Sequence, residues 1–76
     1  MDFDVYVIDS NGNPIEDKKV TVFFDSVFRG YVEEYTDESG HAYFYDLDEG
    51  EAEIYVDHTS HGPYYIEDGN SFTIEA

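Results

Sequence analysis

The feature that most limits what this chain can fold into is an alternation of apolar and other side chains with a period of two residues. In the segment 3–9, for example, Phe3, Val5 and Val7 share one face, and their neighbours lie on the other. A β-strand sends successive side chains to opposite faces, so this period predicts strands with one buried face. No helix is needed to explain the pattern.

Turn residues divide the chain at short and regular intervals, as in 11–14 (Asn-Gly-Asn-Pro) and 37–40 (Asp-Glu-Ser-Gly). We expect strands at 3–9, 19–25, about 30–35, 41–46, 51–57, 64–67 and 71–75, with a loop over 58–63. The side chains expected to point inward are Phe3, Val5, Val7, Val20, Val22, Phe24, Ala42, Phe44, Ala52, Ile54, Val56, Phe72 and Ile74. The spacing predicts an all-β sandwich of about seven strands, and 76 residues have room for one domain, 1–76.

The charge of the chain bears on its partners. It has 19 Asp and Glu against 3 Lys and Arg, a formal net charge of -16, whereas a magnitude of about 2 to 8 keeps a small domain soluble. Acidic disordered tails are poor in aromatic residues, but this chain is 41% hydrophobic with 8 Tyr and 6 Phe. We therefore expect a folded acidic domain that repels nucleic acid and attracts a basic partner.

Several segments, in order, are typical of one family. They are Val5-Tyr6-Val7-Ile8-Asp9, Asn11-Gly12-Asn13-Pro14-Ile15, Val20-Thr21-Val22, Thr36-Asp37-Glu38-Ser39-Gly40, Phe44, Leu47, Gly50 and Ile54-Tyr55-Val56. This pattern resembles the carboxypeptidase regulatory-like domain. The resemblance implies a transthyretin-like β-sandwich of about seven strands and implies no catalytic activity.

One turn segment resembles a calcium-binding loop. Asp9, Asn11 and Asn13 begin like a calcium loop, but that loop needs Gly and Glu where this chain has Pro14 and Val20. A turn explains the segment better.

The histidines also include residue types that occur in metal and catalytic sites. His58 and His61, with Asp57 and His41 elsewhere, contain metal-ligating types, and Asp57, Ser60 and His61 contain the types of a nucleophilic triad. Neither set has a scaffold in the sequence that aims its side chains at one point. We expect no enzyme, no metal and no cofactor. Without cysteine or a signal segment, we expect a cytoplasmic protein.

The acidic residues group into clusters that we interpret as a partner-binding surface. Its expected members are Glu33, Glu34, Asp37, Glu38, Asp46, Asp48, Glu49, Glu51, Glu53 and Asp57. On one strand face, carboxylates at i and i+2 lie roughly 6.6 to 6.8 Å apart, comparable with successive phosphates along a DNA strand. Glu51, Glu53 and Asp57 are expected to form such a row.

The leading hypothesis is therefore a DNA mimic that occupies the basic DNA-binding surface of a bacterial DNA-binding protein. By composition and size the chain resembles phage-encoded host-takeover proteins that inhibit the histone-like nucleoid protein HU, which would place it in the cytoplasm of an infected bacterial host. The alternative is a non-catalytic accessory module of a secreted or surface protein, from a salt-loving or calcium-rich setting.

A set of aromatic side chains is expected on the outward faces: Tyr6, Phe23, Tyr43, Tyr45 and Tyr55. Tyrosine is enriched at interfaces, and small sheets have open edges. The set predicts a homodimer, unless a loop or the last strands cover these rings.

Overall fold

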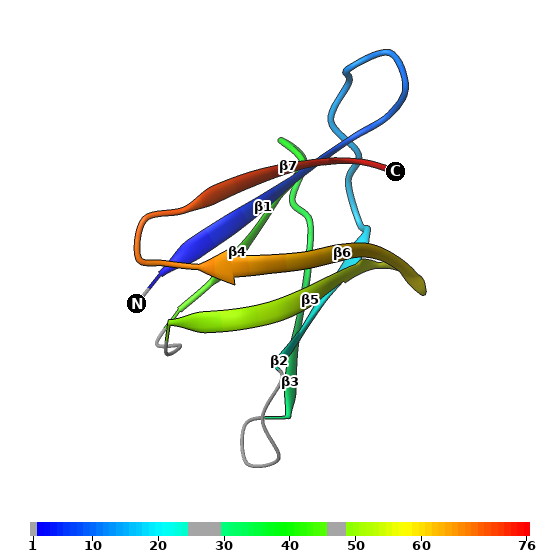
Figure 1. Cartoon of the computed structure of the whole chain (residues 1–76). Helices are drawn as coiled ribbons and strands as arrows, with labels where there is room; N and C mark the ends of the chain where they lie inside the picture. Colours follow the sequence, from blue (N-terminus) through cyan, green and yellow to red (C-terminus); the bar gives the residue numbers. More distant parts are fainter. Residues whose placement is uncertain (1, 25–29, 46–48) are drawn as a thin grey trace.

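The computed structural model describes residues 2–24, 30–45 and 49–76, and this part of the chain is all-β (Figure 1). Its strands are β1 (Phe3–Ile8), β2 (Lys19–Phe24), β3 (Tyr31–Tyr35), β4 (His41–Phe44), β5 (Gly50–Val56), β6 (Thr59–Ile66) and β7 (Ser71–Glu75). None of the described residues forms a helix of the length and apolarity needed to cross a membrane. The expected strand ends at 25 and 46 lie outside the described residues.

The described strands form two sheets, one of order β4-β1-β7 and one of order β3-β2-β5-β6. Every pair is antiparallel except β1 and β7, which run parallel. The inner faces of both sheets contribute to one hydrophobic core, so the arrangement is sandwich-like, as the alternation predicts. The buried apolar residues are Phe3, Val5, Val7, Val20, Val22, Phe24, Ala42, Phe44, Ala52, Ile54, Val56, Ile66 and Ile74. Phe72, also expected inside, is only partly buried.

The prediction of a loop over 58–63 is wrong. β6 begins at Thr59, directly after a two-residue turn in which Asp57 has a φ of 55°. Gly62 and Pro63 suggested a loop, but β6 is the edge strand of its sheet, where proline is tolerated because fewer ladder hydrogen bonds depend on its missing N–H. The strand places Ile66 in the core.

The connection between β1 and β2 is held against the turn between β3 and β4. The buried Thr36 hydroxyl donates a hydrogen bond to the Ile15 carbonyl at 2.7 Å and accepts one from the Lys18 N–H at 2.9 Å. Gly40 has a φ of 84°, and a Cβ at this position would lie 2.8 Å from Pro14 Cβ. The two loops therefore touch at a point where only glycine fits.

Carboxylates of two turns bind the backbone. Asp9 Oδ1 accepts the N–H groups of Asn11 and Asn13 at 2.8 and 3.0 Å, which explains the segment that resembled a calcium loop. Asp37 Oδ1 accepts the hydroxyl of Ser39 at 2.8 Å and the N–H of His41 at 3.1 Å. These hydrogen bonds lower the pKa of both aspartates below the ordinary value.

Candidate protein-binding surface

The outer face of the sheet β3-β2-β5-β6 combines aromatic and acidic side chains, and we call it the four-stranded face. Its outward residues alternate with the buried ones: Lys19, Thr21, Phe23, Tyr31, Glu33, Tyr35, Glu51, Glu53, Tyr55, Pro63 and Tyr65. The large rings are well exposed, 58% for Tyr31 and 62% for Tyr35 and Tyr65. The exposed rings gathered on one sheet face make this face a candidate interaction site.

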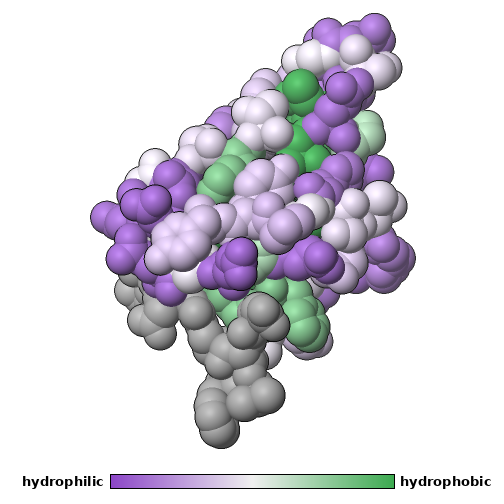
Figure 2. All heavy atoms as spheres, in the orientation of Figure 1, coloured by the Kyte–Doolittle hydropathy of each residue, from purple (hydrophilic) through white to green (hydrophobic). Residues whose placement is uncertain are grey.

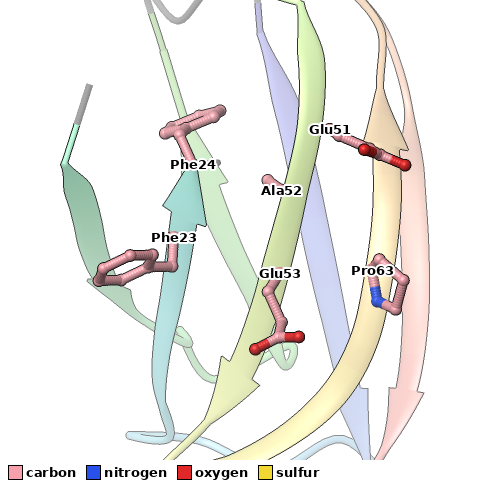
Figure 3. A pocket seen from close by; sticks show the side chains of 6 residues that line it. All are labelled: Phe23, Phe24, Glu51, Ala52, Glu53 and Pro63. Atoms are coloured by element: carbon pink, nitrogen blue, oxygen red, sulfur yellow. The ribbon is translucent and has the colours of Figure 1, made fainter. Parts of the chain in front are cut away.

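Phe23 stands near the middle of this face and separates two shallow hollows. Its ring is parallel to that of Tyr31, with an interplanar angle of 4° and 6.0 Å between centroids. One hollow, the β5–β6 hollow, has a volume of about 340 Å³ and is lined by Phe23, Phe24, Glu51, Ala52, Glu53 and Pro63 (Figure 3). The other, the β2–β3 hollow, has a volume of about 330 Å³ and is lined by Lys19, Thr21, Phe23, Tyr31, Glu33, Tyr55, Asp57 and His58.

The β2–β3 hollow is partly neutralised by lysine. Lys19 Nζ lies 3.8 Å from Glu33 Oε2, and Lys18 Nζ lies 3.0 Å from Asp57 Oδ2 at the same end of the sheet. The hydrogen bond from Lys18 lowers the pKa of Asp57. The third basic residue, Arg29, lies outside the described residues.

The β5–β6 hollow has a different charge. Its lining contains the carboxylates of Glu51 and Glu53 and, among the described residues, no lysine or arginine. The Tyr55 hydroxyl donates a hydrogen bond to Glu53 Oε2 at 2.5 Å, which holds this carboxylate in place and raises the pKa of Tyr55. The hollow therefore presents negative charge, with Glu53 between the ring of Phe23 and the carboxylate of Glu51, which point to opposite sides (Figure 3).

The acidic residues expected to contact a partner do not form one surface. Glu33, Glu51 and Glu53 lie on the four-stranded face, and Glu34 is exposed on β3. Asp37 and Glu38 lie in the β3–β4 turn at the end where Asp57 lies, and Glu49 precedes β5 at the other end. Asp46 and Asp48 lie outside the described residues.

The expected row of carboxylates on β5 is interrupted. Tyr55 occupies the outward position between Glu53 and Asp57, and Asp57 is paired with Lys18. Of the row, Glu51 and Glu53 remain as neighbours on the same face.

An acidic group that was not predicted from the sequence lies at the end of the molecule where β1 starts. The N–H of Asp2 donates to Asp68 Oδ1 at 2.8 Å, and the N–H of Gly69 donates to the Asp2 carbonyl at 2.7 Å, so the turn that contains Glu67 is fixed beside Asp2. Figure 2 shows hydrophilic residues gathered around this turn. The pairing of β1 with β7 creates the group, and nothing local in the sequence signals it.

The aromatic residues expected at a dimer interface lie on two opposite faces. Tyr6 and Tyr43 are on the outer face of the sheet β4-β1-β7, whereas Phe23 and Tyr55 are on the four-stranded face. Tyr45 follows β4 and is 63% exposed. The last strands do not cover the rings of Phe23 and Tyr43, which are 50% and 44% exposed.

A second cluster that the sequence analysis missed lies on the outer face of β1 and β4. His41 Nδ1 is 2.6 Å from Asp4 Oδ2, and the Ser71 hydroxyl donates to the same oxygen at 3.2 Å. Because serine contacts the carboxylate and not the imidazole, the order of a nucleophilic triad is not met. Among the residues that the structure describes, no group of three metal-ligating side chains is close enough to hold an ion.

No family model matches this chain, and a search of curated proteins finds no significant match. The functional inference therefore depends on the surfaces described above.

Proposed function

We propose that this protein binds the basic DNA-binding surface of a bacterial DNA-binding protein, with the histone-like nucleoid protein HU as the preferred target, and blocks its binding to DNA. The protein acts by occupancy and not by catalysis. Its acidic side chains take the place of DNA phosphates, in the setting of phage takeover of a bacterial host.

The main observation in support is that the positive and negative charges are unevenly distributed. Lys18 and Lys19 are paired with Asp57 and Glu33 at one end of the four-stranded face. At the other end, the lining of the β5–β6 hollow contains carboxylates without a described basic neighbour. Phosphate contacts dominate the affinity of DNA-binding proteins, so a surface of fixed carboxylates competes for the same lysines and arginines. Architectural proteins such as HU read little base sequence, so a charge pattern without base edges suffices.

The test is a gel-shift competition at about 0.15 M salt, in which the protein displaces duplex DNA from HU. Polyglutamate at equal charge is the control. We expect displacement by the protein at concentrations where polyglutamate has no effect. Equal displacement by polyglutamate, or no displacement by the protein, contradicts the proposal.

A matched pair of variants locates the surface. Replacing Glu49, Glu51 and Glu53 with Gln should weaken competition about tenfold, at about 0.5 kcal/mol for each carboxylate at an interface rim, mainly by slowing association. The control removes three charges elsewhere by replacing Glu16, Asp17 and Glu75 with Gln or Asn. If the affinity for HU falls equally in the two variants, the four-stranded face is not the binding surface.

We also propose that the sandwich has a transthyretin-like topology. Seven described strands in two sheets support a transthyretin-like fold of the carboxypeptidase regulatory-like kind. That family favours the alternative function, an accessory module of a secreted or surface protein. The genomic neighbourhood separates the two: phage early genes support the DNA mimic, and a long secreted reading frame supports the module.

We further propose that the protein is a homodimer joined through the outer face of β4-β1-β7. Tyr6 and Tyr43 lie on this face, and of the acids on its strands Asp4 is bound by His41 while Glu75 lies at the end of β7. Pairing there leaves the four-stranded face accessible to the partner. Sedimentation equilibrium should give twice the mass of the 8.8 kDa chain, and Tyr43→Ser should restore the monomer. A wild-type monomer at high concentration and moderate salt contradicts the dimer.

A further inference from the structure

We propose that the β5–β6 hollow receives one arginine side chain of the basic partner, with the guanidinium bound by Glu53 on the side of the hollow where Phe23 lies and with Glu51 adding negative charge from the far side (Figure 3). This inference rests on the proposed function and specifies the group that the surface recognises. Three neighbouring strands contribute to the hollow, because Phe23 comes from β2, the two glutamates from β5 and Pro63 from β6 (Figure 3).

The aromatic wall of the hollow suits a planar cation. Phe23 is 50% exposed although it lies within a central strand, and its parallel arrangement with Tyr31 fixes the orientation of the ring. A guanidinium stacks on an aromatic face and is weakly hydrated, whereas the ammonium of lysine is a compact and strongly hydrated charge. The wall therefore favours arginine over lysine.

The fixed orientation of the Glu53 carboxylate also suits a guanidinium. Glu53 is fixed by the Tyr55 hydroxyl through one carboxylate oxygen, Oε2, which leaves Oε1 to accept a hydrogen bond from a ligand. Glu51 lies on the same face two residues away, roughly 6.6 to 6.8 Å along the strand. A guanidinium has five donors in a planar fork and binds carboxylates with more than one of them.

Charge complementarity identifies a basic protein segment, and not a second copy of this chain, as the occupant. Two copies meeting at this face would bring the glutamates of one against those of the other. Lys18 and Lys19 are both engaged at the opposite end of the face. The β2–β3 hollow contains one of these lysines and so is a poorer receptor for a cation.

The experiment measures the binding of fluorescein-labelled nona-arginine and nona-lysine by anisotropy at about 0.15 M salt. The wild type should bind nona-arginine about three- to fivefold more tightly than nona-lysine. Phe23→Leu keeps the apolar bulk but removes the ring, and should bring this ratio close to one. Tyr55→Phe releases Glu53 without a change of charge and should weaken nona-arginine binding about two- to threefold.

A charge-matched pair completes the design. Replacing both Glu51 and Glu53 with Gln should weaken nona-arginine binding about tenfold, and replacing both Glu16 and Glu75 with Gln should weaken it less than threefold. Thermal melts verify that each variant is folded. An arginine preference that Phe23→Leu leaves unchanged, or equal losses in the two double variants, overturns the inference.

The outcomes separate this inference from the proposed function. If the wild type displaces DNA from HU but does not distinguish the two peptides, the arginine site is wrong and the DNA mimic stands. If the wild type neither displaces DNA nor binds either peptide, both are wrong.

Discussion

His41 and Asp4 join the two strands of an antiparallel pair across the outer face of the smaller sheet, with 2.6 Å between imidazole Nδ1 and carboxylate Oδ2. The imidazole is stacked on the ring of Tyr6, with 4.6 Å between centroids, and is followed by Tyr43 at 5.6 Å. The contact is thus part of a short ladder of rings that fixes the register of β1 on β4.

The first prediction concerns this ladder. His41→Ala removes a hydrogen bond to a charged group and two ring contacts, and should lower the free energy of unfolding by about 1 to 2 kcal/mol. His58→Ala, in the exposed β5–β6 turn, is the control and should change it by less than about 0.5 kcal/mol. Urea denaturation at pH 7 measures both. Equal effects would show that the ladder adds nothing to stability.

The second prediction tests the contact between the two loops at Gly40. Gly40→Ala should lower the free energy of unfolding by about 2 kcal/mol or more. The positive φ is unfavourable for alanine, and the new Cβ would meet Pro14 Cβ and the Val7 carbonyl oxygen. Gly69→Ala is a matched control, since Gly69 has a φ of 80° but nothing within 4 Å of an added Cβ. Gly69→Ala should lower the free energy of unfolding by only about 1 kcal/mol, the cost of placing alanine at a positive φ. The difference between the two variants isolates the steric contact.

The third prediction concerns self-repulsion. A net charge of -16 in so small a domain opposes folding, and added salt screens it, since the Debye length falls from about 30 Å at 0.01 M to about 3 Å at 1 M. The melting temperature should rise by about 5 °C, equivalent to about 1 kcal/mol in a domain of this size. Replacing Glu34 and Glu38 with Gln should raise the melting temperature at low salt and reduce the further gain from salt. An unchanged melting temperature would contradict the repulsion argument.

The fourth prediction concerns pH. The pKa values of Asp9 and Asp37 are lowered in the folded state, from the ordinary 3.8, by hydrogen bonds within their turns. Their stabilising contribution is therefore fully present above about pH 4 and is lost as the pH falls through the lowered values. The double variant Asp9→Asn with Asp37→Asn should be less stable at pH 7. Its deficit relative to the wild type should shrink between pH 5 and pH 2.5 in urea titrations. A deficit independent of pH would show that the two charges do not contribute.

Much of this fold follows from local sequence. The alternation in β1, β2, β4 and β5 predicts their inner faces, because a strand with one buried face allows only one assignment of its side chains. β6 was not predicted in full, because Gly62 and Pro63 are breakers in a central strand but acceptable in an edge strand. Whether a strand lies at an edge depends on the whole sheet and cannot be known from its own residues.

The candidate site was harder to predict for the same reason. Glu51 and Glu53 were identified as acidic residues on one strand face, but their relation to Phe23 depends on the pairing of β2 with β5. The ion pairs of Lys18 and Lys19, which distinguish the two hollows, also join residues far apart in the sequence. Composition predicts a basic partner, and the position that we propose for a basic side chain depends on the register of the strands.

The parallel pairing of β1 with β7 has a consequence for how the chain reaches its folded state. β1 is the central strand of its sheet, and one of its two neighbours is β7, so Asp4 meets Ser71 only when the five strands between them in the sequence are available. Contacts between such distant segments form slowly, because the loop between them must be closed before they contribute energy. During synthesis, the first strand therefore emerges long before its second partner, and one edge of this central strand stays uncovered until β7 arrives.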